Sequence, residues 1–195
     1  MLNASAVVDL GTGGGERRFR LLDRLAARGE VPNRVAATEG WEPNVKVARE
    51  SLRPRRIEVY ACDPEAGDRV PCSDGTFDPA MNRHEAINAE EIERLLMPGG
   101  RFLTQQVRGL DVPEFREWFG SIPQYPHATP ENLCRELEEV GLNVETVDDW
   151  SGAMTFSDAE ALVTYLGLVP WDVPEDFSVD AYAETLCVWT LVRFR

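Results

Sequence analysis

Apolar residues along the chain fall into short runs, separated by stretches in which apolar positions recur at helical spacing. Short apolar runs bounded by Gly, Pro, Asp or Asn are typical of buried strands, whereas apolar residues three and four positions apart are typical of amphipathic helices. The apolar runs predict strands over residues 4–10, 35–39, 57–62, 77–82, 101–107, 142–147 and 186–194. The helical spacing predicts helices over residues 16–28, 45–52, 86–96, 130–140 and 159–168.

This alternation of strands and helices predicts an α/β fold, in which a mostly parallel sheet carries helices on both faces. The chain has 195 residues, which suits one domain with a sizeable core. We expect a single domain over residues 1–195, with its core over 4–150 and with peripheral helices and a last strand over 151–195. Pro79 is unusual in the middle of such a sheet, because proline lacks the N–H that a strand ladder needs.

The first predicted strand ends in a loop in which Gly11, Gly13 and Gly15 alternate with other residues, and Asp9 stands two positions before the first glycine. Glycine permits positive φ and lets the backbone approach a ligand closely. A strand, a glycine loop and a helix in this order hold nucleotide-like ligands in open α/β sheets. An ordinary glycine-rich turn after a core strand is the structural alternative.

The residues after this loop argue against a phosphate ligand. A P-loop ends in Gly-Lys-Ser/Thr, but Glu16 follows Gly15, and Lys46 is the only lysine in the chain. A dinucleotide-binding loop has its third glycine at the position that Glu16 occupies, where a carboxylate would repel a pyrophosphate. The same position argues against an NAD-dependent oxidoreductase.

A second carboxylate stands at the end of the second predicted strand. Glu39 at this place can accept hydrogen bonds from the two vicinal hydroxyls of a ribose. Gly40 and Trp41 follow it directly. The Trp41 ring is suited to packing against an adenine, and equally to a place in the core or in an interface.

Several segments together resemble the class I S-adenosylmethionine-dependent methyltransferases. Residues 9–15 match the Asp-x-Gly-x-Gly-x-Gly spacing of motif I in that family. Residues 70–78 resemble the segment that enters its fourth strand, and residues 96–100 resemble its Leu-x-Pro-Gly-Gly turn. Residues 82–85, followed by 102–107, resemble a bacterial, methyltransferase-11-like subgroup that acts on small molecules. The resemblance implies a Rossmann-like, mostly parallel sheet of seven strands with helices on both faces.

The resemblance also implies a cofactor, S-adenosylmethionine, which has no phosphate and whose sulfonium cation is compatible with nearby carboxylates. It implies cofactor contacts from the ends of several strands, namely Asp9, Gly11, Thr12, Gly13, Gly15, Glu39, Gly40, Trp41, Asp68 and Asn82. Asp63 is the alternative to Asp68 for an acidic contact to the adenine. His84 is either a general base or a histidine that anchors its loop through hydrogen bonds. Glu85 is interpreted as a helix-start charge or as an ion-pair partner of Arg83.

The reaction implied by the resemblance is methyl transfer to an unidentified small molecule (EC 2.1.1.-). The alternative is a degenerate, non-catalytic binding module. Family members carry a helical segment before motif I that covers the substrate, whereas the first strand here begins almost at Met1. We therefore also expect a shortened member of the family.

The charge balance argues against nucleic acid as a substrate. The chain has 34 Asp and Glu against 20 Lys and Arg, a formal net charge of −14, and no basic residue lies between Arg135 and Arg193. Proteins that bind nucleic acid need a basic face to offset phosphate charge. Two histidines and four scattered cysteines predict no metal site. No apolar run reaches membrane-spanning length, so we expect a cytoplasmic monomer or homodimer that acts on a small molecule.

Overall fold

The structure is a computed structural model that describes residues 5–15, 23–24, 27, 29 and 31–191. The chain divides into two compact units. The first comprises Met1–Gln106 with Glu136–Asn143, and the second comprises Val107–Arg135 with Val144–Arg195. Each unit is a body with its own apolar core, and the first carries the glycine loop.

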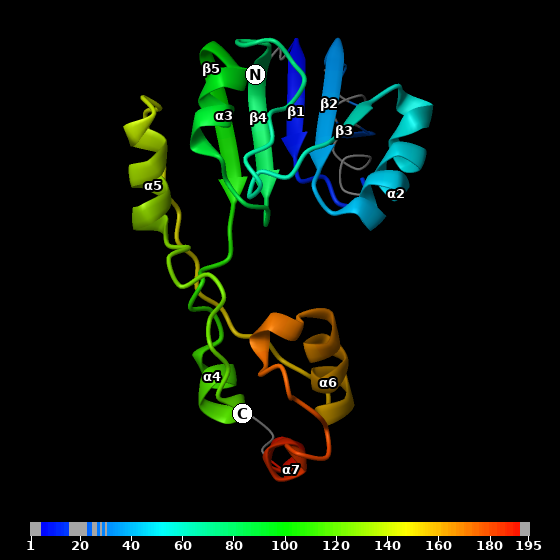
Figure 1. The fold of residues 1–195 in the computed structure, drawn as a ribbon, viewed down its shortest axis with the longest axis vertical. Helices are drawn as coiled ribbons and strands as arrows, with labels where there is room; N and C mark the ends of the chain where they lie inside the picture. The colour runs from blue at the N-terminus through cyan, green and yellow to red at the C-terminus, as the bar shows by residue number, and fades with distance from the viewer. Residues whose placement is uncertain (1–4, 16–22, 25–26, 28, 30, 192–195) are drawn as a thin grey trace. The chain divides into compact units, whose positions relative to one another are not determined.

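The first unit is built on a parallel sheet of five described strands in the order β3-β2-β1-β4-β5 (Figure 1). Its strands are β1 (Ala6–Leu10), β2 (Arg34–Glu39), β3 (Glu58–Ala61), β4 (Phe77–Arg83) and β5 (Leu96–Gln105). The order reverses on either side of β1, since the chain moves first to β2 and β3 and then to β4 and β5. Ligands of open α/β sheets bind at such a switch point, outside the carboxyl ends of the strands.

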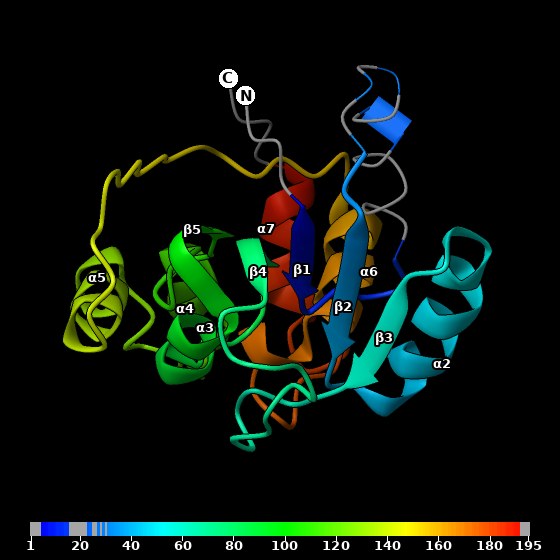
Figure 2. The same cartoon turned by 90° about the horizontal axis from the view of Figure 1, so that it is seen from above.

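Two helices pack along this sheet in the described part of the first unit. Helix α2 (Glu42–Leu52), followed by η1 (Arg53–Arg55), lies beside β2 and β3, whereas α3 (Ala89–Leu95) lies beside β4 and β5 (Figure 2). Proline in the first turn of α2 costs little, because the N–H it lacks has no partner within the helix. Most of the predicted helix over residues 16–28 lies outside the described residues.

The core of the first unit lies on both faces of the sheet. Ala36 belongs to an apolar cluster with Val8 and Phe77, whereas the next residue, Ala37, belongs to a second cluster with Leu52. Successive side chains of a strand point to opposite faces, so both faces are packed. This double burial is why the strands are apolar runs and not alternating patterns.

The second unit is mainly helical, with an aromatic core. It contains α4 (Pro113–Phe119), α6 (Ala159–Leu168), η2 (Pro170–Asp172) and α7 (Ala183–Leu191), while α5 (Pro130–Glu139) has residues in both units. The buried residues of this core are Phe115, Phe119, Leu162, Leu166 and Leu186. The Phe119 ring meets the rings of Phe177 and Tyr182 edge to face, at centroid distances of 5.5 and 5.6 Å.

The fold class expected from the sequence is confirmed, but the strand count differs from the seven strands expected. Residues 142–147 form no regular element, so the strand predicted there is wrong. Residues 186–191 are helical within α7, where Leu186 joins the aromatic core, and residues 192–194 lie outside the described residues. A short apolar run does not by itself distinguish a strand from a helix. Here the run packs as a helix against the aromatic core.

Pro79 does lie in a central strand, as the sequence required. The pairing of β4 with β5 shifts register between Phe77 and Pro79. An irregularity of this kind removes one ladder position locally, and that is where a sheet tolerates proline.

Candidate functional site

The loop after β1 adopts the backbone that its glycines permit. Gly11, Gly13 and Gly15 have φ of +72°, +60° and +88°. Residues with a Cβ rarely adopt these values. A Cβ built on Gly15 would lie 2.9 Å from Cγ of Leu52, so this glycine also allows close packing on α2.

The end of β2 holds this loop through three hydrogen bonds, and a fourth positions the Glu39 carboxylate. The Gly11 N–H donates to Oγ1 of Thr38 at 3.1 Å, and the Thr12 N–H donates to the Thr38 carbonyl at 2.8 Å. The Gly13 N–H donates to Oε2 of Glu39 at 2.6 Å, and the Trp41 N–H donates to Oε1 of Glu39 at 3.0 Å. Glu39 is only 3% exposed. Each of its oxygens keeps a further lone pair for a ligand hydroxyl.

Trp41 and Gly40 lie at the same edge of the sheet, and a third predicted residue, Asp9, lies within β1. Trp41 is 64% exposed, so its ring is available to a ligand and is not part of the core. A Cβ built on Gly40 would lie 3.1 Å from Cα of Asp63, so Gly40 lets the loop after β3 approach β2. Asp9 is half-buried within β1, in register with Ala37 and Met81.

Both candidate acids after β3 bind within their own loop. Oδ2 of Asp68 accepts from the Asp63 N–H at 3.0 Å, and Oδ1 of Asp63 accepts from the Glu65 N–H at 2.9 Å. Asp68, but not Asp63, lines a small cavity at the carboxyl edge of the sheet, together with Cys62. Burial, reinforced by nearby carboxylates, raises the pKa of the Cys62 thiol to about 11, so this thiol is neutral at physiological pH.

The segment after β4 presents Asn82, His84 and Glu85. Asn82 is buried, and its amide donates to the Ala86 carbonyl at 3.2 Å and accepts from Nε2 of Gln106 at 2.7 Å. These bonds make Asn82 a support for the loop. His84 is exposed and has φ of +58°, an uncommon value for a residue with a Cβ.

Glu85 lies against the glycine loop. A Cβ built on Gly11 would lie 2.5 Å from Cβ and Cγ of Glu85 and 2.7 Å from its Oε2. Glu85 stands before α3, which begins at Ala89, and it lines the cavity that Asp68 also lines. Glu85 therefore does not lie at the start of a helix, and it packs against Gly11 instead.

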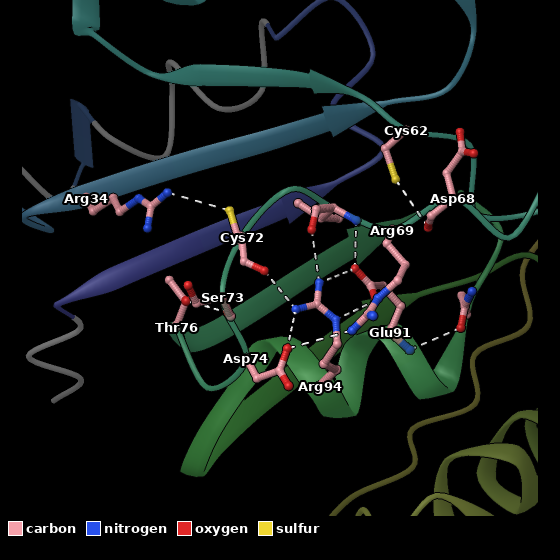
Figure 3. Close-up of polar contacts among 12 residues, drawn as sticks. Arg34, Cys62, Asp68, Arg69, Cys72, Ser73, Asp74, Thr76, Glu91 and Arg94 are labelled. Atoms are coloured by element: carbon pink, nitrogen blue, oxygen red, sulfur yellow. Dashed lines mark hydrogen bonds and ion pairs between the residues drawn. The ribbon is translucent and has the colours of Figure 1, made fainter.

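A buried ion pair holds the loop that precedes β4, as Figure 3 shows. Nη2 of Arg94 donates to Oε1 of Glu91 at 2.6 Å, and the Val70 N–H donates to the same oxygen at 2.7 Å. Nη1 of Arg94 also donates to the Cys72 carbonyl at 2.8 Å and to Oδ1 of Asp74 at 2.7 Å. Burial alone would raise the pKa of the Glu91 carboxyl, but the hydrogen bonds and charge of Arg94 lower it overall.

The structure thus brings together the glycine loop, Glu39, Gly40 and Trp41, with Asp68 and Glu85 at the cavity beside them. Sequence reasoning missed Thr38 and the pair Glu91–Arg94, and it misjudged Glu85. A polar residue at the end of a strand was the available signal for Thr38.

Within the described ranges, no helix is long and apolar enough to cross a membrane. In the same part of the chain, His, Cys, Asp and Glu form no group that could hold a metal ion.

Comparison with known proteins finds one related sequence and several related structures, but no family profile matches the chain. Over 117 residues the chain is 33% identical to the ubiquinone/menaquinone biosynthesis C-methyltransferase UbiE of Methylobacterium nodulans, covering 50% of this chain and 45% of that protein. The chain thus matches about half the length of this curated relative.

Two solved structures share the fold. A SAM-dependent methyltransferase from Aquifex aeolicus superposes with a TM-score of 0.54 at 21% identity, covering 73% of this chain and 74% of that chain. The cyclase SpnF superposes with a TM-score of 0.53 at 18% identity, covering 95% of this chain and 68% of that chain. At such identities these structures show the fold alone. The related sequence supports the expected resemblance to methyltransferases over the matched residues, and the solved structures share the fold.

Proposed function

We propose that this chain, which resembles the class I S-adenosylmethionine-dependent methyltransferases, binds S-adenosylmethionine at the carboxyl edge of its sheet. We further propose that it transfers the methyl group to a small molecule. The observation that carries this proposal is the hydrogen bond between the Gly13 N–H and the buried Glu39 carboxylate. It joins the glycine loop to the carboxylate suited to a ribose.

The residues at this edge fit that cofactor. Glu39 has acceptor capacity left for the two ribose hydroxyls, and the exposed Trp41 ring offers a flat face for adenine. Thr12 Oγ1 is a buried oxygen without a hydrogen-bond partner among the described residues. Such an atom is costly unless a ligand or water satisfies it. The carboxylates Glu39, Asp68 and Glu85 suit a ligand that carries positive charge and no phosphate.

The chain's own residues would bind and orient, since the cofactor, when bound, supplies an already activated methyl group. The glycine loop and Glu39 would hold the ribose end, and Asp9, Gly40, Asp68 and Asn82 complete the proposed set. His84 would remove a proton from an acceptor oxygen or nitrogen where one must be lost. Its exposure at the end of β4 suits that role, and loop anchoring is the alternative.

The acceptor we propose is a small molecule, because a net charge of −14 is unsuited to nucleic acid. The relative UbiE is named as a C-methyltransferase of ubiquinone and menaquinone biosynthesis, so a carbon nucleophile is one class of acceptor to assay. We further propose that the chain acts as one domain, as a monomer or homodimer, in the bacterial cytoplasm. Binding without transfer would identify a non-catalytic module.

Replacing Glu39 tests the cofactor site. Glu39→Gln replaces one carboxylate oxygen by an NH2 group, which donates and cannot accept from a backbone N–H or a ribose hydroxyl. The affinity for S-adenosylmethionine should therefore fall about tenfold or more. Isothermal titration with S-adenosylmethionine and S-adenosylhomocysteine measures this change. Glu42→Gln, at an exposed position in the first turn of α2, is the matched control and should bind normally.

Two results would contradict the proposal. The unchanged protein could fail to bind either compound at millimolar concentration, or Glu39→Gln could bind as tightly as the unchanged protein. Transfer itself is measured with S-adenosylmethionine labelled in its methyl group and a panel of small-molecule acceptors. In that assay His84→Ala should lower turnover more than cofactor affinity.

A further inference from the structure

Glu85 is the acidic side chain packed directly on the glycine loop. The Gly11 backbone approaches it so closely that a Cβ there would overlap the Glu85 side chain, and Oε2 is the oxygen on this side. Oε1 accepts from the Ala86 N–H at 3.1 Å. The carboxylate is therefore positioned with one oxygen toward the loop that we propose holds the cofactor.

The backbone around Glu85 is held from two strands. Nε2 of Gln106, just past β5, donates to the Glu85 carbonyl at 3.1 Å, and the amide of Asn82, on β4, donates to the Ala86 carbonyl at 3.2 Å. The His84 N–H donates to the Gln105 carbonyl at 3.0 Å. These hydrogen bonds hold the backbone at Glu85 in place. The carboxylate can therefore move away from the glycine loop only if the side chain changes rotamer or the backbone shifts.

The surroundings of Glu85 favour a cation beside it. Burial raises the pKa of this carboxyl, and the charges of Glu39, Asp63 and Glu65 raise it further, against a lowering by the Ala86 N–H. A carboxylate that is partly desolvated and faces other carboxylates gains more from a nearby positive charge than an exposed one does. A ligand with a positive charge near the loop would meet this demand.

Methyl transfer removes such a charge. The bond between sulfur and the methyl carbon breaks, and its electron pair stays on sulfur, which changes from a sulfonium to a neutral thioether. The acceptor's electron pair forms the new bond to carbon, and any proton that the acceptor must lose passes to a base or to water. Donor and product thus differ by one positive charge at sulfur and one methyl group.

We propose that Glu85 makes the site selective for the charged methyl donor over its neutral-sulfur product, and so favours product release after transfer. This inference rests on the proposed function. Glu85 acts here as a specificity residue, and its contribution is separable from that of Glu39, which binds the ribose that donor and product share.

The test compares two ligands in three proteins. Isothermal titration gives the dissociation constants of S-adenosylmethionine and S-adenosylhomocysteine for the unchanged chain, for Glu85→Gln and for Glu93→Gln. Glu93→Gln removes the same charge from an exposed position on α3 and is the matched control. In Glu85→Gln the dissociation constant of the donor should rise about tenfold, because one nearby charge pair is lost, while that of the product changes less than about twofold.

The outcomes separate the inference from its premise. Equal changes for both ligands, or an unchanged ratio, overturn the role of Glu85, since a merely structural role would affect donor and product alike. Failure of both ligands to bind the unchanged chain overturns the proposed function instead. Glu85→Ala serves as a second variant if Glu85→Gln is unstable, and its donor-to-product ratio should shift in the same direction.

Discussion

Position 11 requires glycine for two separate reasons. Its φ of +72° disfavours any residue with a Cβ, and the Glu85 side chain occupies the space that a Cβ would take. Gly13 has a similar φ of +60°, but among the described residues a Cβ there would meet nothing within 4 Å. The two positions therefore separate backbone strain from steric overlap.

Gly13→Ala should lose about 1–2 kcal/mol of unfolding free energy, the cost of a left-handed conformation for alanine. Gly11→Ala should lose more, because it must also displace Glu85 from the loop. Urea unfolding measures both losses. Equal losses in the two variants would show that Glu85 does not pack on Gly11 in solution.

The carboxylate of Glu39 shows how binding and stability combine in one residue. It is buried and accepts two backbone N–H groups, so removing it to Ala leaves donors unsatisfied at a cost of about 1–3 kcal/mol. Glu39→Gln is for this reason a cleaner test of ligand binding than Glu39→Ala.

At the scale of the elements, the guanidinium of Arg94 joins α3 to the loop that precedes β4. Arg94 and Glu91 have side chains only 12% and 10% exposed, and together they bind the backbone of Val70 and Cys72. This loop follows residues 63–68, and Val70 within it lines the same cavity as Glu85. The position of the loop therefore affects the shape of that cavity. Breaking a buried pair is costly because the remaining charge is uncompensated.

Arg94→Met should lower the unfolding free energy at neutral pH by about 3–5 kcal/mol. Glu91→Leu combined with Arg94→Met should recover part of this loss, since no buried charge then remains. Arg53→Met, at an exposed position in η1, is the control and should change stability little. A small loss in Arg94→Met would contradict the buried ion pair.

The same pair predicts a dependence on pH. The folded-state pKa of Glu91 is lowered from 4.5, so the stability it contributes is present above about pH 4.5 and is lost as the pH falls through the lower folded value. The difference in unfolding free energy between the unchanged chain and Arg94→Met should therefore shrink from neutral pH toward pH 3. Urea unfolding at several pH values measures it, and a constant difference would count against the assignment.

Two strands that the sequence patterns predicted, over residues 142–147 and 186–194, are not found in the described residues. Residues 142–147 and 186–194 are apolar enough for strands, but a strand also requires a neighbour with free hydrogen-bonding groups. Leu186 instead completes an aromatic core with Phe115 and Phe119. Local composition is similar in both cases, and the partner selects the element.

At the scale of the whole molecule, the proposed site draws on segments of the first unit that are distant in sequence. They are residues 11–15 after β1, residues 38–41 at the end of β2, residues 62–70 after β3 and residues 82–86 after β4. They meet at the carboxyl edge because all five described strands are parallel. The amino ends of β2 and β3 lie at the opposite edge of the same sheet.

Hydrogen exchange with and without S-adenosylmethionine should locate the ligand. Amides of residues 11–15 and 38–41 should exchange more slowly with the ligand bound, because the bound state must open before they exchange. The amides of Arg34 and Glu58, at the opposite edge, are the internal control and should change little. Protection at that edge, or none at the glycine loop, would refute the placement.

The α/β class, the glycine loop and the carboxylate at the end of β2 could all be predicted from the sequence. These depend on short-range effects: burial on both faces of a strand, and backbone conformations that only glycine adopts freely. Three features became known only from the three-dimensional structure. Thr38 and Glu39 bind the loop, Glu85 packs on Gly11, and residues 186–191 are helical. Those contacts join residues far apart in the chain, and their energies depend on which groups the fold brings within hydrogen-bonding or packing distance.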